Sequence, residues 1–138
     1  MARGPLQFRF NTREFDAKVR RALAMHPRQA MRAMRDIKNL LVLEVKKRTP
    51  VREGHLTGSI TGEAVQLQKS WAATVFVPLN SPAAAYAVWL HEGDYNLGEN
   101  SLAKQGKTGC TVGPKYITRA IEENRERIVE IMREALKK

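Results

Sequence analysis

The feature that constrains the fold most is the stretch of residues 27–48, PRQAMRAMRDIKNLLVLEVKKR. Proline suits the first turn of a helix because its missing N–H needs no partner there. The next proline, Pro50, disfavours helical backbone at Thr49 and is expected to end the run. Between these points apolar residues recur at spacings of three and four, the period of one helix face. The sequence therefore predicts one helix of about 33 Å, around which the rest of the chain packs.

Four consecutive apolar residues, 40–43, interrupt the one-sided pattern in the middle of this helix. A helix that is apolar on every side must be covered on more than one side. We therefore expect the helix to contact more than a single layer of neighbouring structure.

The positive charge is confined to one part of the chain. Residues 1–52 hold 14 Lys or Arg against 4 Asp or Glu, whereas residues 53–138 hold 10 of each. A one-sided basic surface implies an acidic partner, which is a nucleic acid, a membrane surface or an acidic protein face. A solvated helix face without a dedicated partner is the alternative. The expected basic surface consists of Arg13, Arg20, Arg21, Arg28, Arg32 and Arg35.

Length and composition indicate a single domain over residues 1–138. No apolar run approaches the roughly 20 residues of a membrane span, and the N-terminus lacks the apolar region of a secretory signal. The chain has one cysteine, Cys110, which excludes an internal disulfide and a Cys-based metal cluster. These features favour a reducing cytosol, or a particle assembled in one.

The remaining segments predict a small sheet and further helices. Residues 1–11 form a basic arm or an edge strand, and a short helix follows to about Met25. Alternating residues 65–68 and the β-forming residues 71–77 make an antiparallel hairpin. A short helix is expected within residues 80–93, ended by Gly93, and an amphipathic helix runs from Pro114 to the C-terminus. The fold class is therefore α+β, with long helices packed on a small antiparallel sheet.

Residues 94–113, DYNLGENSLAKQGKTGCTVG, are rich in Gly, Asn, Lys and Ser and lack periodicity. A loop of this length in a small domain is functional or becomes ordered on a partner. We expect a long flexible loop whose docking residues are Asp94, Tyr95, Lys104 and Lys107.

Fragments of catalytic motifs fail on their context. Gly106-Lys107-Thr108 resembles the end of a phosphate-binding loop, but Ser101 replaces the required glycine and no strand precedes it. His91-Glu92 lacks the second histidine of a zinc helix. We expect no catalytic residue, no cofactor and no metal. A small hydrolase that uses His55, His91 and Glu92 is the lowest-ranked class.

Three segments in order carry a resemblance to a known family. Residues 47–60, KRTPVREGHLTGSI, resemble the TPVDTGNLRRSI segment of the HK97 gp10-like family of tailed-bacteriophage head–tail joining and tail-completion (neck) proteins. Residues 86–93, YAVWLHEG, and 113–121, GPKYITRAI, resemble its YAxYVEFGT and PFLxPAL segments. Glu53, His55 and Asp94 depart from the pattern, and the match covers roughly residues 27–138.

The resemblance implies a non-enzymatic virion part at the head–tail junction, assembled in the host cytoplasm. Such proteins form homo-oligomeric rings, with a hexamer favoured over a dodecamer, between portal or adaptor proteins and tail-terminator or tail-tube proteins. DNA passes through the channel, and no membrane is involved. The expected ring interface contains Leu40, Leu43, Tyr86, Trp89 and Leu90.

A basic nucleic-acid-binding module is the competing class. The arginine-rich helices of the N-terminal third would then contact phosphates. No helix-turn-helix, zinc-finger or RNA-recognition signature supports that class.

Overall fold

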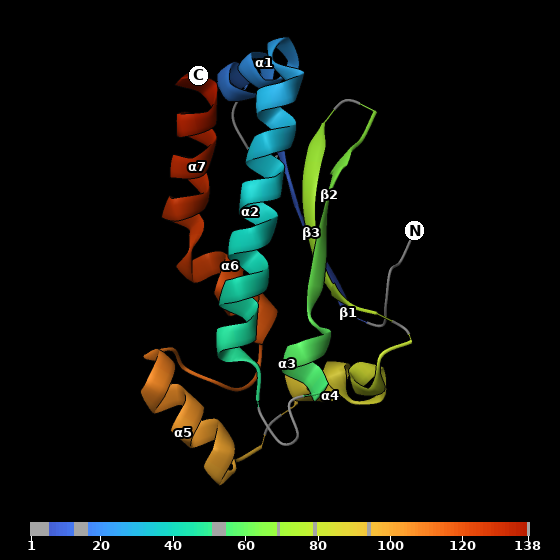
Figure 1. The fold of residues 1–138 in the computed structure, drawn as a ribbon, viewed down its shortest axis with the longest axis vertical. Coiled ribbons are helices and arrows are strands. Elements are labelled where there is room, and N and C mark those ends of the chain that lie inside the picture. The colour runs from blue at the N-terminus through green and yellow to red at the C-terminus, as the bar shows by residue number, and fades with distance from the viewer. Residues whose placement is uncertain are drawn as a thin grey trace.

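The computed structural model describes residues 6–12, 17–50, 55–68, 70–78, 80–93 and 95–137. The fold is α+β, with helices packed on a three-stranded antiparallel sheet, as the sequence predicts (Figure 1). The elements in chain order are β1 (Leu6–Asn11), α1 (Ala17–Met25), α2 (Pro27–Arg48), α3 (His55–Ser59), β2 (Thr61–Gln66), β3 (Trp71–Val77), the 3-10 helix η2 (Pro82–Ala85), α4 (Ala87–Glu92), α5 (Glu99–Thr108), α6 (Tyr116–Glu123) and α7 (Arg125–Lys137).

Helix α2 is the centre of the fold and has the predicted bounds, with Pro27 in its first turn and extended backbone at Thr49. It packs against β2 and β3 on one side and against α6 and α7 on the other (Figure 1). Met34, Ile37 and Leu41 are among its buried residues. The apolar middle of α2 is therefore covered on two sides by the same chain, while Leu43 stays exposed.

The sheet has the strand order β1-β3-β2, and both pairings are antiparallel. Residues 6–11 thus form an edge strand, and the second strand begins at Thr61, earlier than the alternation at 65–68 indicates. Phe10, Ala73 and Val75 lie in the core that α2 shares with the sheet. Residues 13–16, which include much of the expected start of the first helix, lie outside the described residues.

The prediction of one uninterrupted C-terminal helix is wrong, because the chain bends at Asn124 between α6 and α7. Asn124 is buried and has φ −112° and ψ 14°. Its side-chain Nδ2 donates to the carbonyl oxygen of Ala120 at 2.9 Å, while its own carbonyl accepts from the N–H of Ile128. A short polar side chain that bonds nearby backbone competes with the helical ladder, which accounts for the break.

The prediction of a continuous loop over residues 94–113 is also wrong, since its middle forms α5 beyond the C-terminal end of α2 (Figure 1). Gly109 ends this helix in the left-handed conformation, with φ 72°, and its N–H donates to the carbonyl of Gln105. Glycine is the usual residue at this position because it has no Cβ to clash. Part of this glycine-rich and polar segment thus forms a helix, and Gly109 is its C-cap.

Within the described part of the chain, no helix combines the length and the apolar character needed to cross a bilayer.

Candidate interaction surfaces

Helix α4 presents aromatic side chains to solvent. Trp89 is 59% exposed, and Tyr86 and Val88 are 37% and 40% exposed. The indole of Trp89 stacks on the ring of Tyr95, with the centroids 5.2 Å apart and the planes 21° from parallel. The hydroxyl of Tyr95 donates to the carbonyl of Leu90. Trp89 is therefore both exposed and held in place, which is typical of a residue that contacts a partner.

The opposite face of α4 is fixed to the core. Ala87 and His91 are buried, and the His91 ring lies between Phe8 of β1 and Tyr116 of α6, at centroid distances of 5.1 and 4.8 Å. The Tyr116 hydroxyl donates to the Ala87 carbonyl at 2.7 Å. Lys115 donates its backbone N–H to the His91 carbonyl. These contacts set the orientation of the exposed face of α4.

His91 is a buried titratable group. Its Nδ1 lies 3.3 Å from Oε1 of Glu92, which also pairs with Lys115, and its Nε2 is buried with no hydrogen-bond partner among the described residues. Burial lowers the pKa of His91, and the carboxylate of Glu92 opposes this shift only in part. The neutral imidazole is therefore the form that the folded chain accommodates.

We expect acid to destabilise the fold through His91. Its pKa is lower in the folded chain than its ordinary value of 6.5, so the unfolded chain binds more protons as the pH falls below neutrality. The Tm of the wild-type protein should fall between pH 7 and pH 5, a window above the titration of most carboxylates. His91→Phe should fill the same apolar slot and give a shallower fall. The control is His26→Gln, which removes an exposed histidine and leaves the core unchanged. An equal slope in His91→Phe would contradict the assignment.

Of the three residues of the hydrolase alternative, the structure describes only the side chains of His91 and Glu92. His91 is fully buried, Glu92 pairs with Lys115, and the side chain of His55 lies outside the described residues. Within the described ranges, no group of three His, Cys, Asp or Glu side chains is placed to hold a metal ion.

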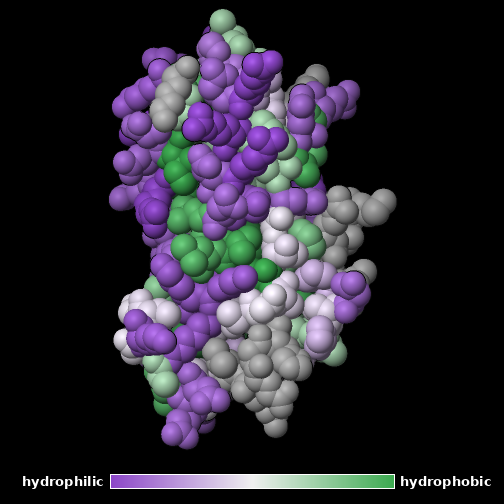
Figure 2. Space-filling view, viewed as in Figure 1, coloured by the Kyte–Doolittle hydropathy of each residue, from purple (hydrophilic) through white to green (hydrophobic). Residues whose placement is uncertain are grey.

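The predicted basic surface lies on α1 and the first half of α2. Arg20, Arg21, Arg28, Arg32 and Arg35 are all exposed, and Arg13 lies outside the described residues. Figure 2 shows hydrophilic side chains gathered over the end of the molecule where these helices lie. The periodicity of α2 places three of these arginines on one side of the helix.

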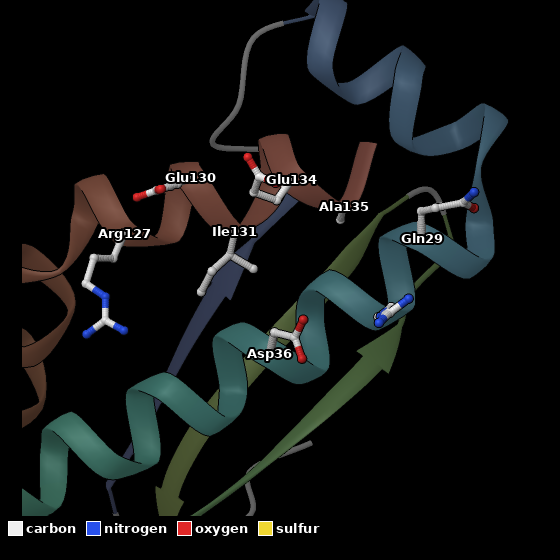
Figure 3. Close-up of a pocket in the computed structure, with 8 residues that line it drawn as sticks. Gln29, Asp36, Arg127, Glu130, Ile131, Glu134 and Ala135 are labelled. Atoms are coloured by element: carbon white, nitrogen blue, oxygen red, sulfur yellow. The ribbon is translucent and has the colours of Figure 1, made fainter. Parts of the chain in front are cut away.

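Carboxylates border this basic surface on the side of α7. A groove between α2 and α7 is lined by Arg32 and Asp36 from α2 and by Arg127, Glu130 and Glu134 from α7. Figure 3 shows Asp36 and Ile131 directed into the space between the two helices. A surface that follows a nucleic-acid backbone is uniformly positive, and here glutamates interrupt it.

Lys104, one of the predicted docking residues, instead anchors α5 to the end of α2. Its Nζ donates to the carbonyl oxygen of Thr49 at 2.8 Å and to the hydroxyls of Thr49 and Thr57 at 3.0 and 3.2 Å. Burial lowers the pKa of Lys104 to about 8. Lys107 is exposed and Tyr95 supports Trp89, whereas Asp94 lies outside the described residues. The middle of the expected docking loop is therefore a helix that Lys104 fixes through partly buried hydrogen bonds.

The expected ring-interface residues fall into two groups. Leu43 is 55% exposed, and Tyr86 and Trp89 are exposed as described above. Leu40 is only 7% exposed and belongs to the core, and Leu90 is partly buried against it. Leu40 was wrongly placed because an all-round apolar sequence does not reveal which side the same chain covers.

A buried ionic cluster was not found from the sequence. Arg48 donates through Nη1 to the Glu44 carbonyl at 2.8 Å and through Nη2 to Oε1 of Glu123 at 3.1 Å. The side chains of Arg48 and Glu44 are 5% and 7% exposed. The spacing of Glu44 and Arg48 is the available signal, but residues 46–48 read equally well as cations at a helix end.

No protein-family model, no curated protein and no solved structure matches the chain. The surfaces of this structure and the three resembling segments are therefore the basis on which a function is proposed.

Proposed function

We propose that this chain is a structural subunit of a tailed-phage neck, located in the virion, where copies of it form a ring at the head–tail junction. The observation that carries the proposal is the exposed, fixed aromatic face of α4. This face lies in residues 86–93, the segment that resembles the YAxYVEFGT motif of the neck-protein family. The proposed role is assembly and involves no catalysis.

The chemistry of α4 supports a protein contact. Tryptophan and tyrosine are enriched at the centres of protein interfaces, where a rigid apolar ring gains most from leaving water. Tyr86, Val88 and Trp89 keep large apolar side chains in water while the other face of α4 is anchored by Tyr116. Contacts between different faces of identical subunits close into a ring when the rotation between neighbours permits it.

The neighbours in this proposal are portal or adaptor proteins on one side and tail-terminator or tail-tube proteins on the other, with a hexamer favoured. The exposed arginines of α1 and α2 then face an acidic neighbouring ring or the DNA in the channel. The carboxylates in the α2–α7 groove favour the protein neighbour.

The test is the assembly state of purified protein over a range of concentrations, measured by native mass spectrometry and analytical ultracentrifugation. We expect the wild-type chain to form a closed oligomer and Trp89→Ser to reduce its population at least about tenfold, the effect of one interface residue worth about 1.4 kcal/mol. Leu102→Ser, which removes an apolar side chain 52% exposed on α5, is the matched control and should assemble normally. A wild-type monomer at every concentration, or normal assembly of Trp89→Ser, would contradict the proposal.

A basic nucleic-acid-binding module remains the second candidate, favoured by the exposed arginines of α1 and α2. Tight binding of a monomer to unrelated duplex DNA, with affinity that falls steeply with salt, would support that function.

A further inference from the structure

A shallow groove lies between α2 and β2. Its apolar part is formed by Val42 and Leu43, and Lys38 and Lys46 lie on its borders. None of the residues that line it is acidic. Figure 2 shows an apolar patch in the middle of the face on which α2 runs beside the sheet, with hydrophilic side chains around it. The groove is therefore an apolar strip within a positive border.

The outer surface of α6 and α7 has the opposite character near the bend at Asn124. Glu122, Glu126 and Glu130 are exposed there and line the surface together with the partly buried Val129. Arg125, Arg133 and Lys137 also line this surface, the last two toward the C-terminal end of α7. Next to the bend, acidic side chains therefore outnumber basic ones on this surface.

Five charged groups on these two surfaces form no ion pair with a described residue. Among the described residues, the glutamates that form ion pairs with lysine or arginine are Glu44, Glu92, Glu123 and Glu134. Neither Lys38 and Lys46 nor Glu122, Glu126 and Glu130 form an ion pair with a described residue. These groups are therefore available to another molecule.

We infer that the groove between α2 and β2 of one copy receives the α6–α7 bend of the next copy of this chain. Glu122, Glu126 and Glu130 then face Lys38 and Lys46, and Val129 contacts Val42 and Leu43. This inference rests on the proposed ring and adds a second contact between neighbouring copies, separate from the α4 face.

The placement of the two surfaces favours a second copy as the occupant. They lie on elements that flank α2 from opposite sides, the sheet and α7 (Figure 1), so one molecule can use both at once. A contact between two different faces of identical subunits is heterologous and propagates from copy to copy. Exposed ion pairs are individually weak, so their effect here is to fix the orientation and the choice of partner.

The test uses two charge-reversed variants. Lys38→Glu/Lys46→Glu makes the groove acidic, and Glu122→Lys/Glu126→Lys makes the bend basic. We expect each variant alone to lose oligomer at least about tenfold in native mass spectrometry, since like charges then face each other. An equimolar mixture should regain it, because each groove then meets a bend of opposite charge and the two variants alternate around the ring.

A control, Glu99→Lys, reverses an exposed charge on α5 outside both surfaces and should assemble like the wild-type chain. Recovery in the mixture also shows that both variants are folded. Normal assembly of either variant alone, or no recovery in the mixture, would overturn the pairing of these faces. If the wild-type ring forms and depends on Trp89 while the charge variants have no effect, the proposed function stands and only this pairing fails.

Discussion

Replacing Arg48 by alanine is expected to lower the free energy of unfolding by about 1.5–3 kcal/mol, because the buried guanidinium loses its hydrogen bonds to the Glu44 carbonyl and the Glu123 carboxylate. The Glu44 side chain, which is 7% exposed, then keeps only its ion pair with Lys47. Urea unfolding followed by circular dichroism measures the loss, and the slope with denaturant should stay unchanged if the variant reaches the same fold.

The expected loss is large because Arg48 connects three parts of the chain. Its guanidinium bonds the Glu44 carbonyl within α2 and the Glu123 carboxylate at the end of α6. Its own carbonyl accepts from the N–H of Gly113, which precedes α6. The packing of α6 and α7 on α2 therefore depends on Arg48.

The electrostatics of Glu44 point the same way. Burial alone raises its pKa, but the hydrogen bond and charge of Lys47, the amide of Asn124 and the charge of Arg48 together lower it. A lowered carboxyl pKa stabilises the fold at pH values above the ordinary carboxyl pKa. This contribution is lost as the pH falls through the pKa that the group has in the folded chain. Without Arg48, less opposes the effect of burial, so the charged form of Glu44 is less well stabilised.

Lys47→Ala is the matched control, since Lys47 also pairs with Glu44, at 2.7 Å, but is 36% exposed. A pair of this kind contributes about 0–1 kcal/mol. In the Arg48→Ala background, Glu44→Gln should recover part of the loss because it removes a buried charge that has lost one of its two cationic partners. Equal losses in Arg48→Ala and Lys47→Ala would show that burial of the cluster is not what stabilises it.

The sequence predicts a structural feature where that feature depends on residues nearby in the chain. The bounds of α2 and β3 follow from proline positions and from local runs of helix-forming and β-forming residues, and Gly93 ends α4 as predicted. The exposure of the α1 and α2 arginines follows from helical periodicity in the same way.

The features that were missed depend on distant residues. Arg48 meets a carboxylate 75 positions away, and Lys104 meets Thr49 across 55. The bend at Asn124 depends on a buried side chain, and a sequence pattern does not show burial of a polar residue. Leu40 and Leu43 read identically from the sequence, yet one is in the core and the other in solvent. Separating surface from core within an apolar run requires the packing partners, which only the structure supplies.

Gly62→Ala is expected to destabilise the fold by about 1–3 kcal/mol, the usual cost of forcing extra atoms into a packed region. A Cβ at this position would lie 2.8 Å from the carbonyl oxygen of Thr74 and 2.9 Å from side-chain carbons of Lys38 and Val42. The Thr74 oxygen belongs to the central strand, so β2 itself must shift away from α2. Chemical denaturation measures the loss, and hydrogen exchange should show weaker protection at the β2 amides.

The same substitution at Gly106 should act in the opposite direction. Gly106 is within α5, and nothing would lie within 4 Å of an added Cβ. Alanine in a helix interior is more favourable than glycine by about 0.8–1 kcal/mol, so Gly106→Ala should stabilise. The opposite signs separate the general effect of removing a glycine from the close approach of β2 to α2. Because the same approach forms the groove that contains Val42, Gly62→Ala should also weaken assembly, whereas Gly106→Ala should not.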